Sequence, residues 1–268
     1  MPEGDTIFRA AATLQKAIGG REITGFRSPR PGLAAADLAG RRVERVEARG
    51  KNLLVLLDDG RALLSHMRMT GSWHIYRPGE RWRKPERQAR AVLETKDFVA
   101  VCFNAPVVEL LTQRQLACHP GVARLGPDVL GEHFDPAEAR RRLRERNDAA
   151  IGEALIIQRA LAGIGNIYKS ETLFLCGADP FRPVAAFTDE ELDGIVATAR
   201  ELMSANLEGA ARTTRRALDG GRYWVYGRSG SPCRRCGTRV RMRRQGLAGR
   251  STYWCPSCQA NVRRSRGE

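Results

Sequence analysis

Residues 233–258 read CRRCGTRVRMRRQGLAGRSTYWCPSC, and this stretch decides the fold of the last part of the chain. It contains two Cys-x-x-Cys pairs, Cys233/Cys236 and Cys255/Cys258, with eighteen residues between them. Two pairs at this spacing fit a tetrahedral site of four thiolates, so the sequence predicts a zinc ribbon. Four protein ligands leave no open position on the metal. We therefore expect one structural Zn²⁺ that holds a β-hairpin and takes no part in catalysis.

The positive charge of the chain is concentrated around these cysteines. Residues 222–268 contain twelve Arg and one acidic residue, and they carry +11 of the net charge of +15. This excess favours a polyanionic partner, with nucleic acid preferred to a membrane. Arg250 lies where the predicted hairpin doubles back, which makes it a candidate phosphate ligand, although any single Arg here can equally be a solvated charge. No apolar run approaches 18 residues, so no membrane span is expected.

Upstream of the ribbon, the pattern divides into a β-rich part and a helical part. A helix capped by Asp5 or Thr6 is expected to run to about Ile18, and strands are expected at 42–49, 52–57, 61–67, 72–77, 91–95, 98–103 and 107–111. The sequence therefore predicts an α+β protein in three domains. These are an N-terminal β-sandwich with a leading helix (1–125), a helical domain (126–225) and a zinc-ribbon finger (226–262).

The helical part contains a turn that could approach a phosphate. Asp135-Pro136 begins one helix and Thr188 caps another, which is expected to end near Gly209. Between them, a helix is expected to end near Ala162, and Asn166 is expected to cap the next helix after two glycines. Such a turn exposes backbone N–H groups to a phosphate, but it also fits an ordinary helix–helix connection.

The first residues offer chemistry of a different kind. Removal of the initiator Met would leave Pro2 as a secondary amine beside the carboxylate of Glu3. A terminal amine is more often uncharged at neutral pH than a lysine amine is, so it can act as a nucleophile. Many proteins begin with Met-Pro without using it, and this pair alone is a weak signal.

Two further sites in the β-rich part are candidates for binding nucleic acid. Lys51 follows a glycine at the entry to a strand, where it is either a phosphate ligand or a solvated turn residue. Met67, Arg68 and Met69 close another strand. Two flexible apolar side chains around a cation suit a wedge that fills the gap left by an extruded base, although buried methionines are also common.

Taken together, these pieces resemble the formamidopyrimidine-DNA glycosylase / endonuclease VIII family over essentially the whole chain. The shared motifs are Met1-Pro2-Glu3-Gly4, Gly50-Lys51, Leu161–Asn166 in a helix–two-turn–helix, Tyr226-Gly227-Arg228 and the four-cysteine ribbon. Each motif alone is weak, but their combination in this order is specific.

The resemblance implies a bifunctional DNA glycosylase and AP lyase of base excision repair. In this family Pro2 would form a Schiff base at C1′ of a damaged nucleoside, and Glu3 would protonate or steer the opening sugar before β,δ-elimination. Lys51, Asn166 and Arg250 would contact phosphates, with Arg250 also in the second elimination, and Arg124 matches a further DNA contact. Arg68 stands where endonuclease VIII places a Gln. The implied partner is double-stranded DNA with a damaged base or an abasic site, and the implied setting is a monomer in the bacterial cytoplasm, associated with the nucleoid through DNA.

The branch of the family decides the expected lesion. Gly4 and the short stretch of eleven residues between Thr213-Thr214 and Tyr226-Gly227 favour endonuclease VIII and oxidised pyrimidines. Two features count against this branch. Thr6 stands where the family tends to have Glu, and the motif His66-x-x-Met69-Thr-Gly resembles the branch of oxidised-purine glycosylases. A non-catalytic zinc-ribbon DNA-binding protein and an RNA-binding ribbon protein are the alternatives from other classes, and neither accounts for the terminal Pro-Glu pair.

Overall fold

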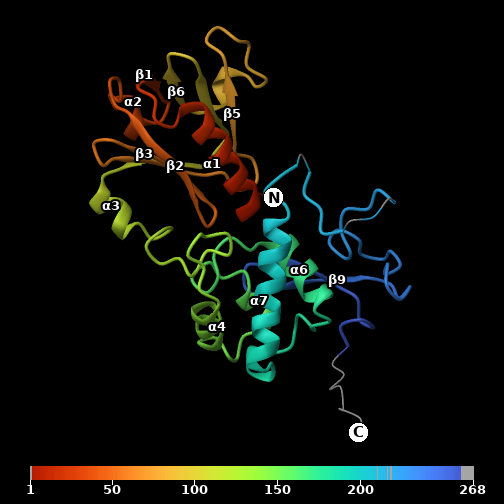
Figure 1. The fold of residues 1–268 in the computed structure, drawn as a ribbon. Coiled ribbons are helices and arrows are strands. Elements are labelled where there is room, and N and C mark those ends of the chain that lie inside the picture. The colour runs from red at the N-terminus through yellow and green to blue at the C-terminus, as the bar shows by residue number, and fades with distance from the viewer. Residues whose placement is uncertain (1, 210, 216, 218, 261–268) are drawn as a thin grey trace. The chain divides into compact units, whose positions relative to one another are not determined.

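A computed structural model of the protein describes residues 2–209, 211–215, 217 and 219–260. The chain divides into two compact units, residues 1–124 and 125–268. Both contain helices and strands (Figure 1). None of the helices in the described part of the chain has the length and apolar character needed to cross a membrane.

The first unit consists of two four-stranded antiparallel sheets and a leading helix, α1 (Gly4–Ile18). The strand orders are β1–β6–β7–β5 and β2–β3–β4–β8. The strands are β1 (Ile23–Arg27), β2 (Val43–Arg49), β3 (Asn52–Leu57), β4 (Ala62–His66), β5 (Ser72–Tyr76), β6 (Ala89–Thr95), β7 (Val99–Phe103) and β8 (Val107–Leu111). One apolar core takes side chains from both sheets and from α1, so the predicted β-sandwich with a leading helix is confirmed.

The leading helix starts two or three residues earlier than predicted. Its N-cap is Glu3, whose backbone carbonyl accepts hydrogen bonds from the N–H groups of Thr6 (3.0 Å) and Ile7 (3.2 Å). Capping by Asp5 or Thr6 was therefore wrong. The Asp5 carboxylate lies in the first turn, is buried and pairs with Arg9 at 3.9 Å.

Three short elements of this unit were not predicted. They are β1, α2 (Pro31–Ala34) and α3 (Gln113–Cys118); a single 3₁₀ turn, η1 (Glu86–Gln88), precedes β6. In β1, Gly25 interrupts the alternation of side chains, and the pairing with β6 shifts register at this point. Such an irregular edge strand carries little periodicity for a sequence pattern to detect.

The second unit is helical, with a two-stranded hairpin near its end. Its elements are α4 (Pro136–Arg144), α5 (Ile151–Ala154), α6 (Asn166–Leu175), η2 (Val184–Ala186), α7 (Asp189–Ser204), β9 (Arg241–Gln245) and β10 (Arg250–Trp254). Helix α7 packs against both α4 and α6 (Figure 1). The first nine residues of α6 are all buried, so this helix forms the centre of the unit.

The helix starts at Asp135 and Thr188 are confirmed. The Asp135 carboxylate accepts hydrogen bonds from the first turn of α4, and Thr188 forms a capping box with Glu191. The helix predicted to end near Ala162 instead ends at Ala154, and α7 ends at Ser204 and not near Gly209. After α5 the chain turns, and Ala162 then forms a parallel bridge with Asp128, which a continuous helix would not allow.

Candidate active site and DNA-binding residues

Pro2 lies just before α1, a helix that is fixed to the core of the first unit. Pro2 is half-buried, and Glu3 beside it is fully buried. Ile7 and Leu14 of α1 enter the core cluster, and Gln15 accepts a hydrogen bond from the N–H of Val46 in β2 at 2.6 Å. Packing and this bond hold α1 on the sheet, so the position of the terminal residues is defined by the body of the unit.

Lys51 lies in a two-residue turn between β2 and β3. Gly50 has φ +60°, the left-handed conformation that a glycine adopts at little cost at the first central position of such a hairpin. The side-chain amide of Asn52 donates to the carbonyls of Arg49 (3.2 Å) and Gly121 (2.8 Å). The turn that presents Lys51 is thus tied to the loop at the end of the same unit.

A second cation and a histidine accompany Lys51. His66 pairs with Asn52 across β3 and β4. Burial lowers the pKa of His66, and the positive charges of Arg68 and Lys51 lower it further. Lys51 directly precedes Asn52 and Arg68 closely follows His66, so the pairing of Asn52 with His66 brings both cations to the same end of β3 and β4. Such a cationic region favours a phosphate.

The predicted wedge segment divides its two methionines between the core and the surface. Met67 is 3% exposed and belongs to the core cluster, whereas Met69 is 67% exposed. Arg68 between them has φ +46°, and its backbone N–H bonds to His66 Nδ1 at 3.2 Å. The packing interpretation therefore fits Met67, whose side chain is not available at the surface, whereas Arg68 and Met69 are exposed.

Gly71 allows this segment to close tightly. A Cβ on Gly71 would lie 2.7 Å from the Met67 Cα and 3.0 Å from the Ala105 Cα. The Gly71 N–H also bonds to the Met67 carbonyl at 2.8 Å. Only glycine permits this approach. Arg124 is the remaining candidate of the first unit. It is the last residue of that unit, and its side chain is exposed.

In the second unit, Asn166 is the first helical residue of α6 and not its cap. The N-cap is Gly165, and Asn166 is 6% exposed. The preceding loop is clamped by Gln158, whose amide donates to the Ile164 carbonyl (3.0 Å) and accepts from the Gly163 N–H (3.0 Å). The turn is therefore rigidly formed at the start of the most enclosed helix of the unit.

The residues that follow Arg250 in β10 contact helix α6. Arg250 is exposed and pairs with Gln245 across the hairpin. The Lys169 ammonium of α6 donates to the Ser251 carbonyl at 3.1 Å and to Thr252 Oγ1 at 2.8 Å. The structure thus brings β10, which begins with Arg250, against the helix that begins with Asn166.

Two buried charges on α6, both missed by sequence reasoning, organise this region. Lys169 and Glu171 are each 0% exposed. The Glu171 carboxylate accepts the backbone N–H groups of Trp224 (2.8 Å), Val225 (2.9 Å) and Tyr226 (2.8 Å). A charged residue in a helix normally indicates an exposed face, and no local signal marks partners that lie more than forty residues away.

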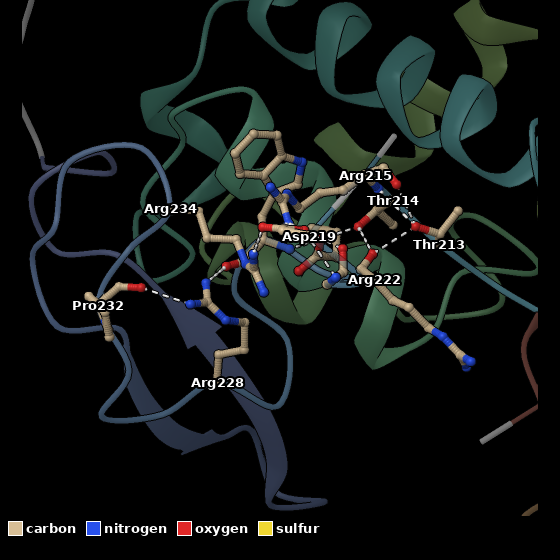
Figure 2. A network of polar contacts seen from close by, with 11 residues as sticks. Thr213, Thr214, Arg215, Asp219, Arg222, Arg228, Pro232 and Arg234 are labelled. Carbon is tan, nitrogen blue, oxygen red and sulfur yellow. Dashed lines mark hydrogen bonds and ion pairs between the residues drawn. The ribbon is translucent and has the colours of Figure 1, made fainter. Parts of the chain in front are cut away.

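A network of polar contacts joins Thr214, Arg215 and Asp219 to Arg234 of the finger (Figure 2). Arg215 Nη1 donates to both carboxylate oxygens of Asp219 (2.9 and 3.0 Å), and Arg234 of the finger pairs with the same carboxylate. The hydrogen bond from Arg215 lowers the pKa of Asp219 to about 2, with smaller effects from the Gly221 N–H and from the nearby charge of Arg234. Thr214 donates to Glu171 and so connects this network to α6.

The four cysteines of the ribbon form a compact cluster. Their sulfur atoms lie within 4.8 Å of one another, with 3.9 Å between Cys233 and Cys258 and 3.5 Å between Cys236 and Cys255. A tetrahedral Zn–S distance of about 2.3 Å requires sulfur–sulfur edges of about 3.8 Å. The donor set and its spacing therefore fit zinc.

The comparisons with known proteins agree with these observations. The model of the formamidopyrimidine-DNA glycosylase N-terminal domain matches residues 1–107, that of the H2TH domain of the same enzymes matches 125–217, and that of the zinc finger found in FPG and IleRS matches 230–261. A probable endonuclease 8 2 of Streptomyces coelicolor is 45% identical over 97% of this chain and 94% of its own length. The chain belongs to the formamidopyrimidine-DNA glycosylase / endonuclease VIII family.

Other relatives support the same placement within this family. The DNA-(apurinic or apyrimidinic site) lyase Nei2 of Mycolicibacterium smegmatis is 39% identical over 97% of this chain and 99% of its own length, and endonuclease 8 of Escherichia coli is 34% identical over 97% and 100%. The MutM (Fpg) structure from Thermus thermophilus matches with a TM-score of 0.78 and 30% identity, over 96% of this chain and 98% of that one. The family is one of DNA-repair enzymes with glycosylase and AP lyase activity, and this α+β, zinc-finger protein is an enzyme of that class.

Proposed function

We propose that the protein removes oxidised bases, with a preference for pyrimidines, through a Schiff base on Pro2, and that it then cleaves the abasic site by β,δ-elimination. The observation that carries the proposal is the position of Pro2 and the fully buried Glu3 at the start of α1, a helix packed into the core. A terminal amine on a fixed helix can be aimed at a substrate, which a mobile terminus cannot.

The chemistry follows from the secondary amine. Once Met1 is removed, the Pro2 nitrogen forms a bond to C1′, the bond from C1′ to the base breaks, and the base leaves with a proton. Glu3 protonates or steers the opening sugar. The resulting iminium is necessarily cationic and accepts electrons during loss of the 3′ and then the 5′ phosphate.

Two groups of side chains hold the DNA in this proposal. In the first unit, Lys51 contacts phosphates, while Arg68 and Met69 occupy the space vacated by the flipped nucleotide, and Arg124 adds a contact. In the second unit, Asn166 and Arg250 bind phosphates, with Arg250 also assisting the second elimination. Lys169 supports this second group through the carbonyl next to Arg250. One structural Zn²⁺ on the four cysteines keeps the finger folded, and the enzyme acts as a monomer in the cytoplasm.

The preference for pyrimidines rests on the short segment between Thr214 and Tyr226. Its two ends are held by the Glu171 carboxylate, and Arg215 near its start pairs with Asp219. Such a closed segment offers little chain to cover a flipped purine. Excision from thymine-glycol or dihydrouracil duplex should therefore be faster than excision from 8-oxoguanine duplex, and the reverse order would assign the enzyme to oxidised purines.

Borohydride trapping tests the chemistry directly. Protein whose intact mass shows that Met1 has been removed is incubated with an abasic-site duplex and reduced, beside a Pro2→Gly variant. The expected result is a covalent adduct for the wild type and little or none for the variant. If processed wild-type protein forms no adduct, the chain is a zinc-finger DNA-binding protein without the lyase reaction.

A further inference from the structure

A strongly basic loop lies in the first unit, outside the residues assigned above. Residues 77–87, RPGERWRKPER, connect β5 to β6 and contain five cationic and two acidic residues. We refer to them as the basic loop. It lines a cavity of about 740 Å³ together with Arg27 and Glu94.

The acidic residues around the basic loop are already engaged. Arg27 Nη1 donates to Glu86 at 2.6 Å, and Arg27 Nε donates to Glu94 at 3.4 Å. The Glu80 carboxylate accepts the backbone N–H of Arg77 at 2.8 Å. These carboxylates therefore organise the loop and one neighbouring strand, and they do not neutralise its outward-facing cations.

Three arginines of the basic loop remain without a counter-charge. Arg81, Arg83 and Arg87 are exposed, and their side chains form no ion pair or hydrogen bond within the described part of the chain. Three uncompensated guanidinium groups within seven residues form a concentrated positive surface. Arginine forks match phosphate oxygens in geometry as well as in charge.

Trp82 fixes this surface to the sheet. Its ring stacks on Tyr76 (6.1 Å between centroids), meets Phe103 edge-on (5.7 Å) and lies under the Arg27 guanidinium (5.1 Å). Lys84 extends the attachment by donating to Ser72 Oγ at 2.8 Å. The loop is therefore held in place. The aromatic ring is occupied by neighbours, so it is not a platform on which a base could stack.

The basic loop covers the outer face of its sheet. Trp73 and Ile75 of β5 pack into the sandwich core, and the alternate residue Tyr76 packs with Trp82 in a separate cluster. Successive side chains of a strand point to opposite faces. The loop thus lies on the face turned away from the core that holds α1.

We infer that Arg81, Arg83 and Arg87 form an additional phosphate-binding surface, which contacts the backbone of duplex DNA without reading its sequence. Charge without a free aromatic face suits backbone contacts and not base recognition. The surface adds to the lesion-binding groups proposed above, because it needs neither a damaged base nor Pro2. Its role is to hold undamaged DNA.

The test compares two triple variants in binding to undamaged duplex DNA over a range of salt concentrations. Arg81→Gln/Arg83→Gln/Arg87→Gln removes the surface, and Lys16→Gln/Arg41→Gln/Arg45→Gln removes the same charge from exposed positions elsewhere in the first unit. Each phosphate contact contributes about 0.9 to the slope of log K against log salt. We expect the first variant to lose between about 0.9 and 2.7 of that slope, and the control to keep the wild-type slope.

Two results would overturn the inference. One is a slope in the first variant equal to that of the control. The other is competition by polyglutamate as strong as that by DNA of equal charge and lost with the same three arginines, which would indicate a surface for acidic proteins. Both measurements use undamaged DNA or no DNA, so they stay interpretable even if borohydride trapping fails.

Discussion

The two units hold their candidate functional residues in different ways. In the first, Pro2 and Glu3 depend on α1, whose apolar face packs into a core between two sheets. In the second, Asn166 begins a helix whose first nine residues are buried, and that helix holds its surroundings through the buried charges of Lys169 and Glu171. Apolar packing tolerates small changes of shape, whereas a buried charge that loses its partners is costly. The second unit should therefore be the more sensitive to single substitutions.

Loss of the metal should produce the largest effect. Structural zinc in small domains contributes about 10–16 kcal/mol of apparent folding free energy at neutral pH. Cys255→Ser, or chelation of the wild type, should unfold the finger, displace β10 from Lys169 and abolish tight binding to abasic-site DNA. Zinc content and hydrogen exchange of residues 226–260 measure this, and Cys118→Ser, which changes an exposed cysteine, is the control. A chelated protein with wild-type exchange in the finger would show that the metal is dispensable.

Glu171→Ala tests the buried charge without touching the metal. The substitution leaves three backbone N–H groups of residues 224–226 without their acceptor. We expect the free energy of unfolding of the second unit to fall by about 3–5 kcal/mol. Denaturant unfolding measures the change, and Glu201→Ala, at an exposed position of α7, should stay within about 0.5 kcal/mol of the wild type. Equal effects of Glu171→Ala and Glu201→Ala would show that the second unit does not depend on the buried Glu171 carboxylate.

Glu171 and Lys169 also show the limit of what the sequence predicts. The four cysteines, the caps at Asp135 and Thr188 and the strands of the sandwich are local patterns, and they could be predicted because the physical cause lies within a few residues. Glu171 and Lys169 look like ordinary helix residues in the sequence. Their burial depends on the segment 214–226 and on β10, which only the tertiary fold brings to them.

The same reasoning explains the errors at the candidate site. Met67 and Met69 are two residues apart and were treated as one wedge, but the turn that follows β4, with Arg68 in a left-handed conformation, leaves one in the core and the other exposed. The apolar run 154–162 predicted a helix because most of its residues are apolar. They are buried by the bridge to Asp128 and by the packed turn, and burial of this kind carries no helical period.

Ile7→Ala tests the apolar side of the comparison. Ile7 is 1% exposed, and removal of a buried isoleucine side chain costs about 2–5 kcal/mol. We expect the first unit to lose stability by this amount and the rate of borohydride trapping to fall, since α1 then fixes Pro2 less firmly. Thr13→Ala, on the exposed face of the same helix, is the matched control. A destabilised Ile7→Ala protein that traps at the wild-type rate would mean that the packing of α1 does not position the amine.

Asp219→Asn should have the smallest effect, because the ion pairs with Arg215 and Arg234 lie at the surface, where water screens them. The folded-state pKa of Asp219 is lowered to about 2 from an ordinary value of 3.8, so the carboxylate stabilises the folded form above the ordinary value, and this contribution is lost as the pH falls toward 2. We expect Asp219→Asn to lower Tm by less than about 3 °C at pH 7 and by progressively less between about pH 4 and pH 3. Thermal unfolding of the variant and the wild type across this range measures the difference, with Asp37→Asn as an exposed control. A large effect at pH 7 would instead show that the closed segment 214–226 depends on surface charge as much as on the buried Glu171 carboxylate.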